Sequence, residues 1–397
     1  MKMQINGTNL IKQHVPGMNS ILLGIGVPVG ACADAPGSSG MAHLCEHLRA
    51  ACCNARLGGD KLRCLTMEAF TEREETFFLL RALRQDADVL LEWLADFFTP
   101  VEVSDAEFER EKSVVLDETV TLECSEIDRI DCAFMAKGYD GTDYSRPVVG
   151  YSEQIGDIGV KAALKFLETQ YRRPGMVVAI VGDIDGTSLW DDVAAILGQA
   201  EFGNDPPQSV RDLYVLQSGR VEVGTSLGMS YFLRGIPTFE RTSDNRVDLY
   251  AISAYLGDDI DSLLFRKLRL ERALLYNIKT EYHLFRNGGH LLVKGLASND
   301  KFNLVLECLD EVLDGMRSWV PDGRIVAKIQ HSLTKALLLN LDEPRNKLLR
   351  LLKHDTWFSH YYTVKDDLAF IGRVTTDSLR RTTEQIFQRP SLLCYGV

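Results

Sequence analysis

The chain has 397 residues, of which 45% are hydrophobic and 25% are charged, and its formal net charge at pH 7 is −12. This composition is typical of a folded globular protein with enough apolar residues for two sizeable cores, and it excludes a disordered chain. The negative charge argues against a nucleic-acid-binding protein, because binding to the phosphate backbone requires clustered lysine and arginine side chains.

The sequence also predicts a cytoplasmic protein with reduced thiols. Residues 1–8 lack the apolar segment of a secretory signal, and the sequence contains no run of about 18 apolar residues that would span a membrane. The 9 cysteines are odd in number and include no C-x-x-C pair. This pattern argues against a disulfide framework and against a cysteine-ligated zinc ion.

Strand and helix patterns alternate along the first half. Residues 20–29 and 76–80 are predicted to be strands, and short apolar runs of this kind suit buried strands. Residues 82–98 carry apolar side chains at helical spacing and are predicted to form an amphipathic helix.

The most informative motif is the segment His43-Leu44-Cys45-Glu46-His47. In a helix, positions i and i+4 lie on one face, so both imidazoles can reach one metal ion while Glu46 lies beside it. This H-x-x-E-H order is the inverse of the commoner H-E-x-x-H zinc motif. Two unrelated surface histidines are the alternative, but histidine occupies only 8 of the 397 positions. The motif therefore favours a zinc hydrolase.

A catalytic zinc ion held by two histidines needs a third protein ligand, usually a carboxylate, and a water molecule. Residues 108–118 predict a charged helix on which Glu111 and Glu118 are seven residues apart, about two turns, so both project from one face. Acidic residues on such a helix usually form only its solvated face. Their spacing alone does not decide between these two readings.

The chain resembles itself at an offset of 216 residues. In each half, a helical stretch ends at an Arg-Pro pair and a short apolar run follows, at residues 176–181 and 392–395. The Arg-Pro pairs are Arg173-Pro174 and Arg389-Pro390. An offset of this length indicates domain duplication rather than a solenoid repeat.

The best linker-like cluster lies at residues 203–209, which contain glycine, asparagine and two prolines. We therefore predict two domains, at residues 1–205 and 206–397. Both halves mix strands with helices, which predicts the α+β class: two homologous domains, each a mixed, mainly antiparallel sheet covered by helices. In the second half the expected strands are residues 220–223, 278–283 and 290–293, and the expected helices are residues 302–316 and 325–339.

Taken together, these motifs resemble the pitrilysin/insulinase family of zinc metallopeptidases, in particular its mitochondrial-processing-peptidase-like branch of two-domain chains. The family has the inverted zinc motif, followed by a helix of the form F-x-x-E-[KR]-x-x-V-x-x-E, which residues 108–118 match. It also carries L-R-E-x-x-G-L-A-Y, and residues 268–276 keep the arginine and the tyrosine of that motif. The resemblance covers nearly the whole chain.

The resemblance implies a role for each matching residue. His43, His47 and Glu118 would hold one zinc ion per chain, and Glu46 would act as the general base. Glu111 would support the site without binding the metal. The resemblance further implies that Arg269 and Tyr276 help to bind the substrate.

This sequence departs from the family pattern in two places. Glu118 follows His47 by 71 residues, several fewer than is usual in the family, so we expect residues 48–67 to have lost part of a helix. The family's Asn-Ala-x-Thr appears here with Glu68 in the asparagine position, before Ala69, Phe70 and Thr71. A carboxylate cannot donate the hydrogen bonds that an amide donates to a substrate backbone.

The resemblance also implies a chamber that admits short or unfolded peptides and an assembly of two chains, in which Arg269 and Tyr276 act on the zinc of the partner chain. Because one chain keeps both sets of motifs, a homodimer is the simplest assembly, and a heterodimer with a paralogous subunit is the alternative. Clearance of oligopeptides and maturation of a ribosomally made precursor are both open as functions. A non-catalytic structural or peptide-binding homologue is the competing class.

Overall fold

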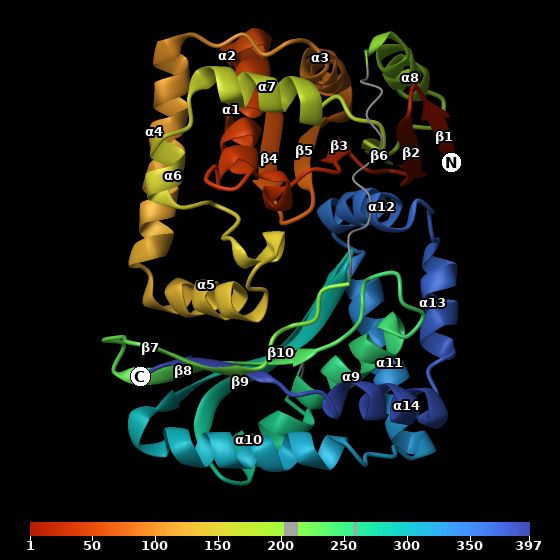
Figure 1. Cartoon of the computed structure of the whole chain (residues 1–397). Helices are drawn as coiled ribbons and strands as arrows, with labels where there is room; N and C mark the ends of the chain where they lie inside the picture. The colour runs from red at the N-terminus through yellow and green to blue at the C-terminus, as the bar shows by residue number, and fades with distance from the viewer. Residues whose placement is uncertain (202–212, 258–259) are drawn as a thin grey trace. The chain divides into compact units, whose positions relative to one another are not determined.

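The computed structural model describes residues 1–201, 213–257 and 260–397. The predicted linker at 203–209, and with it the predicted boundary at 205, lies outside the described residues. The chain forms two compact units, which are coloured along the sequence in Figure 1. The first comprises Met1–Thr121, Arg146–Ser209 and Asn340–Tyr361, and the second comprises Leu122–Ser145, Val210–Leu339 and Tyr362–Val397.

The described residues of the first unit form a six-stranded sheet in the order β1-β2-β6-β3-β5-β4. Neighbouring strands are antiparallel, except that β2 and β6 are parallel. The strands are β1 (Lys2–Ile5), β2 (Thr8–His14), β3 (Ser20–Val27), β4 (Leu65–Thr71), β5 (Thr76–Leu83) and β6 (Val177–Gly182).

Helices cover one face of this sheet and enclose the larger of its two cores. The interior strands β3 and β6 are buried along their whole length, and this explains why their sequences are almost continuously apolar. Trp93 and Phe97 of α3 and Tyr171 pack around Phe78 of β5. The helices of this unit on or near that face are α1 (Met41–Leu57), α2 (Gly59–Leu62), α3 (Ala87–Phe97), α4 (Asp105–Cys124), α6 (Ser152–Gly156), α7 (Val160–Gln170) and α8 (Leu189–Gln199).

The opposite face of the first sheet is covered by α12 (Pro344–Phe358), a helix from the C-terminal part of the sequence. Leu348, Leu351 and Leu352 of this helix are fully buried against the sheet. A Cβ atom at Gly24 of β3 would lie 2.7 Å from Leu352 Cδ1. Glycine at this position therefore allows α12 to approach the strand closely.

The second unit repeats this topology. Its described residues form a five-stranded sheet in the order β7-β11-β8-β10-β9, in which only β7 and β11 are parallel. If β1 is set aside, the strand order and the position of the parallel pair are the same as in the first sheet. The strands are β7 (Gly219–Val223), β8 (Met229–Pro237), β9 (Leu275–Phe285), β10 (Gly288–Ser298) and β11 (Leu392–Gly396).

One face of the second sheet carries the core of this unit, and α5 (Glu126–Gly138) packs against strands β7, β8 and β11. Since α5 comes from the first half of the sequence and α12 from the second, each half contributes one helix to the sheet of the other half. The remaining helices of the unit are α9 (Arg246–Gly257), α10 (Phe302–Met316), α11 (Gly323–Asn340), α13 (Val364–Gly372) and α14 (Thr376–Phe387).

The predicted fold class is confirmed: both halves form a mixed, mainly antiparallel sheet with helices against it. One predicted element was partly wrong, because residues 82–83 belong to β5 and the helix α3 begins only at Ala87. Pairing with β3, in which Ser20 is opposite Leu83, extends the strand into the region of helical periodicity. The pairing of β5 with β3, rather than the local periodicity, thus sets the end of the strand.

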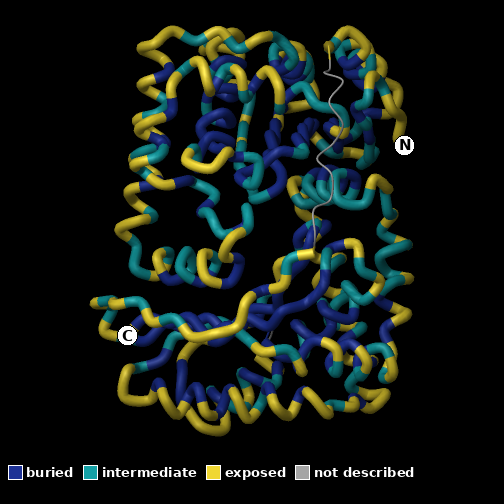
Figure 2. The backbone as a smooth tube through the Cα atoms, in the orientation of Figure 1, coloured by how far each residue is buried: buried dark blue, intermediate teal, exposed yellow. Residues whose placement is uncertain are grey.

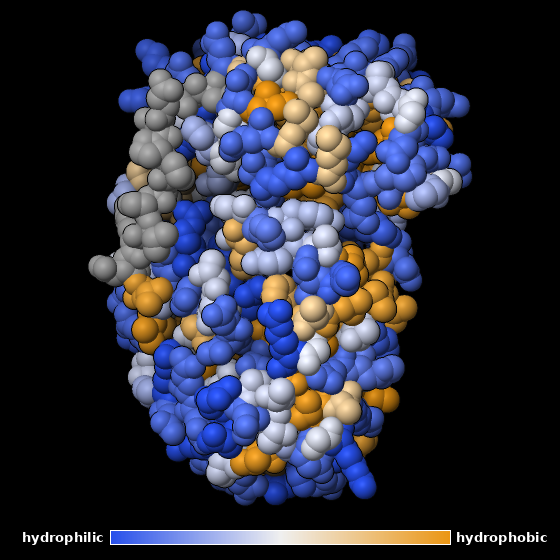
Figure 3. Space-filling model, turned by 90° about the vertical axis from the view of Figure 1, so that its right-hand side faces the viewer, coloured by the Kyte–Doolittle hydropathy of each residue, from blue (hydrophilic) through white to orange (hydrophobic). Residues whose placement is uncertain are grey.

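Buried residues concentrate along the strands and on the inner sides of the helices (Figure 2). Hydrophilic residues cover much of the face drawn in Figure 3, with groups of apolar side chains among them. Among the described helices, none combines the length and the apolar composition that crossing a bilayer requires.

Candidate metal centre and active site

The helix that carries the H-x-x-E-H motif begins at a buried carboxylate. Asp34 accepts hydrogen bonds from the backbone N–H groups of Gly40 at 2.7 Å and of Ala42 at 2.9 Å, in the first turn of α1. Gly40 has φ = 97°, a conformation that favours glycine. Burial raises the pKa of Asp34 to about 7, although the bonds from Ala42 and Gly40 act in the opposite direction. Asp34 thus fixes the start of the motif helix.

His43 and His47 lie one helical turn apart on the same face of α1, with ring centroids 4.9 Å apart. His43 is only 8% exposed. Burial, and then the neighbouring His47, lower the pKa of His43 to about 4. The neutral imidazole, the form that binds a metal ion, is therefore the form of His43 at neutral pH.

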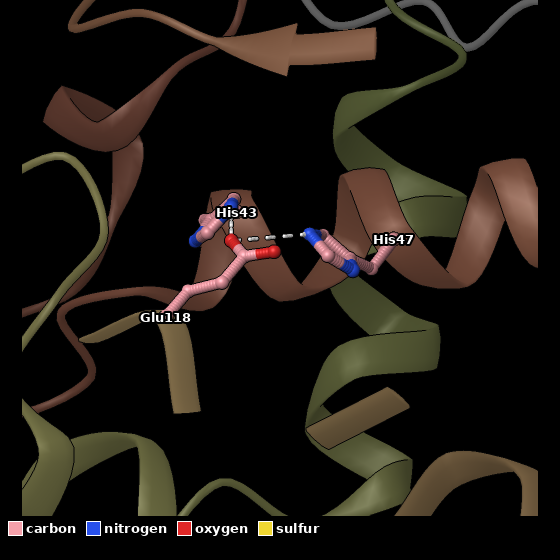
Figure 4. Close-up of side chains that lie close together, drawn as sticks. All are labelled: His43, His47 and Glu118. Carbon is pink, nitrogen blue, oxygen red and sulfur yellow. Dashed lines mark ion pairs between the residues drawn. The ribbon is translucent and has the colours of Figure 1, made fainter. Parts of the chain in front are cut away.

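The structure brings Glu118 of α4 to these two histidines, as Figure 4 shows. Its Oε2 atom is 3.4 Å from Nε2 of His43 and 3.8 Å from Nε2 of His47. One ligand atom from each residue lies within 4.8 Å of the other two. In a tetrahedral zinc site with bonds of about 2.0–2.2 Å, the ligand atoms lie roughly 3.3–3.6 Å apart. The donor types therefore fit one zinc ion, and the separation of 3.4 Å between Glu118 and His43 lies within this range.

Glu111 lies behind His47, on the side away from the metal group. One of its carboxylate oxygens is 4.0 Å from Nδ1 of His47, and the other accepts hydrogen bonds from the guanidinium of Arg110 at 3.1 and 3.2 Å. Its side chain is 17% exposed, whereas that of Glu118 is 49% exposed. At 4.0 Å the two groups make no hydrogen bond, but Glu111 faces the ring nitrogen of His47 that points away from Glu118.

Glu46 is buried beside the metal group, with 5% of its surface exposed. Its Oε2 atom accepts a hydrogen bond of 2.9 Å from the hydroxyl of Thr71 at the end of β4. Burial raises the pKa of Glu46 to about 7; the hydrogen bond from Thr71 opposes this shift and the charge of Glu118 adds to it. A carboxyl group with such a pKa can both accept and return a proton near neutral pH.

These groups line one pocket of about 810 Å³ in the first unit. Besides these polar groups, small and apolar side chains from α1, α2 and β4 line the pocket. The lining residues are His43, Glu46, His47, Ala50, Ala51, Asn54, Ala55, Leu62, Met67, Ala69, Phe70, Thr71, Arg110, Glu111, Glu118, Val148 and Val149.

The segment before β4 is short, as the sequence led us to expect. Helix α1 ends at Leu57, the four-residue α2 follows, and β4 begins at Leu65. Glu68 of β4 forms an ion pair with Arg345 of α12. No sequence signal links Arg345 to Glu68, because the two residues are 277 positions apart.

Arg269 and Tyr276 lie together in the second unit. Arg269 belongs to a π-helical turn, Phe265–Leu270, and its Nη1 atom donates a hydrogen bond of 2.8 Å to the backbone carbonyl of Tyr276. The guanidinium lies 4.6 Å from the centroid of the Tyr276 ring. The tyrosine is 76% exposed, so its hydroxyl group does not belong to a core.

Comparison with known protein sequences identifies related proteins. The family sequence model for insulinase (peptidase family M16) matches residues 10–151, and that for the peptidase M16 inactive domain matches residues 157–332. An uncharacterized zinc protease of Streptomyces coelicolor is 25% identical over 98% of this chain and 88% of its own length. Another, of Mycobacterium leprae, is 24% identical over 96% of this chain and 88% of its own length.

Comparison with solved structures shows the same fold. The crystal structure of a protease from Helicobacter pylori superposes with a TM-score of 0.90, at 17% sequence identity, and the match covers 100% of this chain and 98% of that one. The names of the sequence relatives imply zinc and support a peptidase function in general. The chain belongs to the pitrilysin/insulinase (M16) family of metallopeptidases.

Proposed function

We propose that this protein is a zinc-dependent endopeptidase or oligopeptidase that cleaves short or unfolded peptides. The observation that carries the proposal is the convergence of His43, His47 and Glu118 beside the buried carboxyl group of Glu46, in one pocket. Two imidazoles and one carboxylate are the ligand set of several zinc peptidases. Clearance of oligopeptides and maturation of a ribosomally made precursor are both compatible with this site.

The proposed reaction assigns separate roles to zinc, Glu46 and Glu111. When bound, zinc supplies Lewis-acid chemistry that polarises the oxygen atoms of water and of the peptide carbonyl. Glu46 would take a proton from the attacking water and return it to the leaving amine, a role that its pKa of about 7 supports. Glu111 would keep the ring of His47 in place through Nδ1.

The edge of the first sheet supports a peptide as the substrate. In the described residues, β4 pairs only with β5, so the backbone groups on its other side are available to a further strand. The strand ends at Thr71, which contacts Glu46. A peptide that adds to β4 as a strand would therefore pass the pocket that holds the metal group.

The first test is metal content together with cleavage of a quenched fluorescent peptide library. We expect about one zinc ion per chain, because all three ligands come from the same unit, and we expect a chelator to abolish cleavage. His43→Ala should lose both the metal and the activity. His331→Ala, which changes an exposed histidine on α11, is the matched control and should keep both.

Two results would contradict the proposal. Unchanged zinc in His43→Ala would overturn the metal site. Zinc-loaded wild-type protein that binds the peptides of the library without cleaving them would instead support the peptide-binding alternative.

For the assembly we propose a homodimer in which Arg269 and Tyr276 serve the metal site of the partner chain. The exposed ring of Tyr276, held by Arg269, supports this role. Mixing inactive Glu46→Gln with inactive Tyr276→Phe should then restore activity, because one site of a mixed dimer has every group intact. Activity would be measured after subunit exchange, with differently tagged chains to show mixing. Dimers that are mixed but inactive would exclude action between chains.

A further inference from the structure

The ion pair between Glu68 and Arg345 lies beside the candidate peptide-binding edge. Nε of Arg345 donates to Oε2 of Glu68 at 2.7 Å, and Nη2 donates to Oε1, so the pair is bidentate. The side chains of Arg345 and Glu68 are 46% and 45% exposed. A pair this exposed stabilises a fold very little. Stabilisation of the fold is therefore a weak reason for two aligned hydrogen bonds at this position.

The pair has no net charge, but it presents unused N–H donors of the guanidinium, rather than a free carboxylate, to its surroundings. Both carboxylate oxygens of Glu68 accept from Arg345, whereas a guanidinium has more N–H donors than these two bonds use. In the described part of the chain, Arg345 makes no hydrogen bond other than the two to Glu68. Its guanidinium also lies 5.8 Å from the ring centroid of Phe70, which lines the pocket. The remaining donors are available to a ligand.

Strand geometry relates this cation to a bound peptide. Side chains alternate between the two faces of a strand, so Glu68 and Phe70 point to the face that α12 covers, whereas Met67 and Ala69 point to the other face. A peptide added to β4 would present every second side chain on the α12 face, next to Arg345. Lys353 of α12 forms an ion pair of 2.6 Å with Glu72, the residue after the strand, and this pair satisfies both charges.

We propose that Arg345, oriented by Glu68, is a specificity-determining residue that selects peptides with an acidic side chain near the cleaved bond. Glu68 lies three residues before Thr71, the residue that contacts Glu46, a distance of roughly 10 Å along the strand. The acidic side chain would thus lie about two to four residues from the cleaved bond. This inference rests on the proposed binding of peptides along β4.

Peptide binding gives the direct test. Fluorescence anisotropy would compare labelled peptides that carry glutamate or glutamine at one position at a time, with the full-length Glu46→Gln chain as the receptor. At one position we expect the glutamate peptide to bind about fivefold more tightly, the size of a partly exposed ion pair. Adding Arg345→Gln should remove this preference, and Arg345→Lys should keep part of it.

Two further variants separate recognition from structural support. Arg84→Gln removes an arginine as exposed as Arg345, which pairs with Asp183 at 3.0 Å elsewhere in the first unit, and should leave the preference intact. Glu68→Gln removes the competing carboxylate, while its amide oxygen can still accept a hydrogen bond from Arg345 and orient it, so the preference for glutamate should persist or increase. Loss of the preference in this variant would contradict the proposed role of Arg345.

The outcomes distinguish the two proposals. If the chain binds the peptides equally, or if the preference for glutamate persists in Arg345→Gln, the role of Arg345 is wrong while the peptidase assignment stands. If the chain binds none of the peptides and the wild type cleaves none, both proposals are overturned.

Discussion

Replacing Glu46 with glutamine is expected to lower peptide hydrolysis by about a hundredfold or more while zinc stays bound. Glutamine keeps the size of the side chain and can still bond to Thr71, but it cannot accept a proton from water. Glu46 is not among the three residues whose ligand atoms converge, so the metal group should remain intact. The measurement is single-turnover cleavage of a quenched peptide, with zinc determined on the same samples.

The pH dependence gives a second readout for the same variant. Burial raises the pKa of Glu46 to about 7, so the ionised base is lost as the pH falls through that value. A bound dication lowers this pKa, and we therefore expect kcat/KM of the wild type to fall at or below pH 7. The Glu46→Gln variant should lack this acidic limb. Near-normal turnover in zinc-loaded Glu46→Gln would show that the motif serves another chemistry.

Glu118→Gln is expected to weaken zinc binding itself, and with it all activity, because a neutral amide replaces the anionic ligand. Glu111→Gln should have a smaller effect, about 10–100-fold in affinity, since Glu111 contacts His47 rather than the metal group. Competition with a chromophoric chelator measures both affinities. Glu109→Gln, an exposed glutamate on the same helix, is the control and should bind zinc as the wild type does.

The order of these effects tests the assignment of ligands. If Glu118→Gln retains the wild-type affinity, the third ligand is not Glu118. If Glu111→Gln loses more zinc than Glu118→Gln, the two carboxylates have exchanged roles.

The architecture was largely predictable because the core strands are short apolar runs. The expected strand at 278–283 is the middle of β9, and the expected helix at 302–316 has the bounds of α10. The duplication inferred from the Arg-Pro pairs reappears as the same strand order in both sheets. Edge strands such as β1 were missed, because their exposed residues carry no apolar pattern.

The sequence alone determined that His43, Glu46 and His47 share one turn of helix, since the spacing of residues within a helix is local geometry. It also determined the family and the duplication. Only the tertiary structure decided that Glu118, 71 residues further on, reaches both histidines, and that Glu111 turns to the other side of His47. The tertiary structure also decided that Glu68 pairs with Arg345, and that α5 and α12 each pack on the sheet of the opposite half of the sequence. Such contacts depend on how sheets and helices pack across long stretches of chain, and no local pattern encodes that packing.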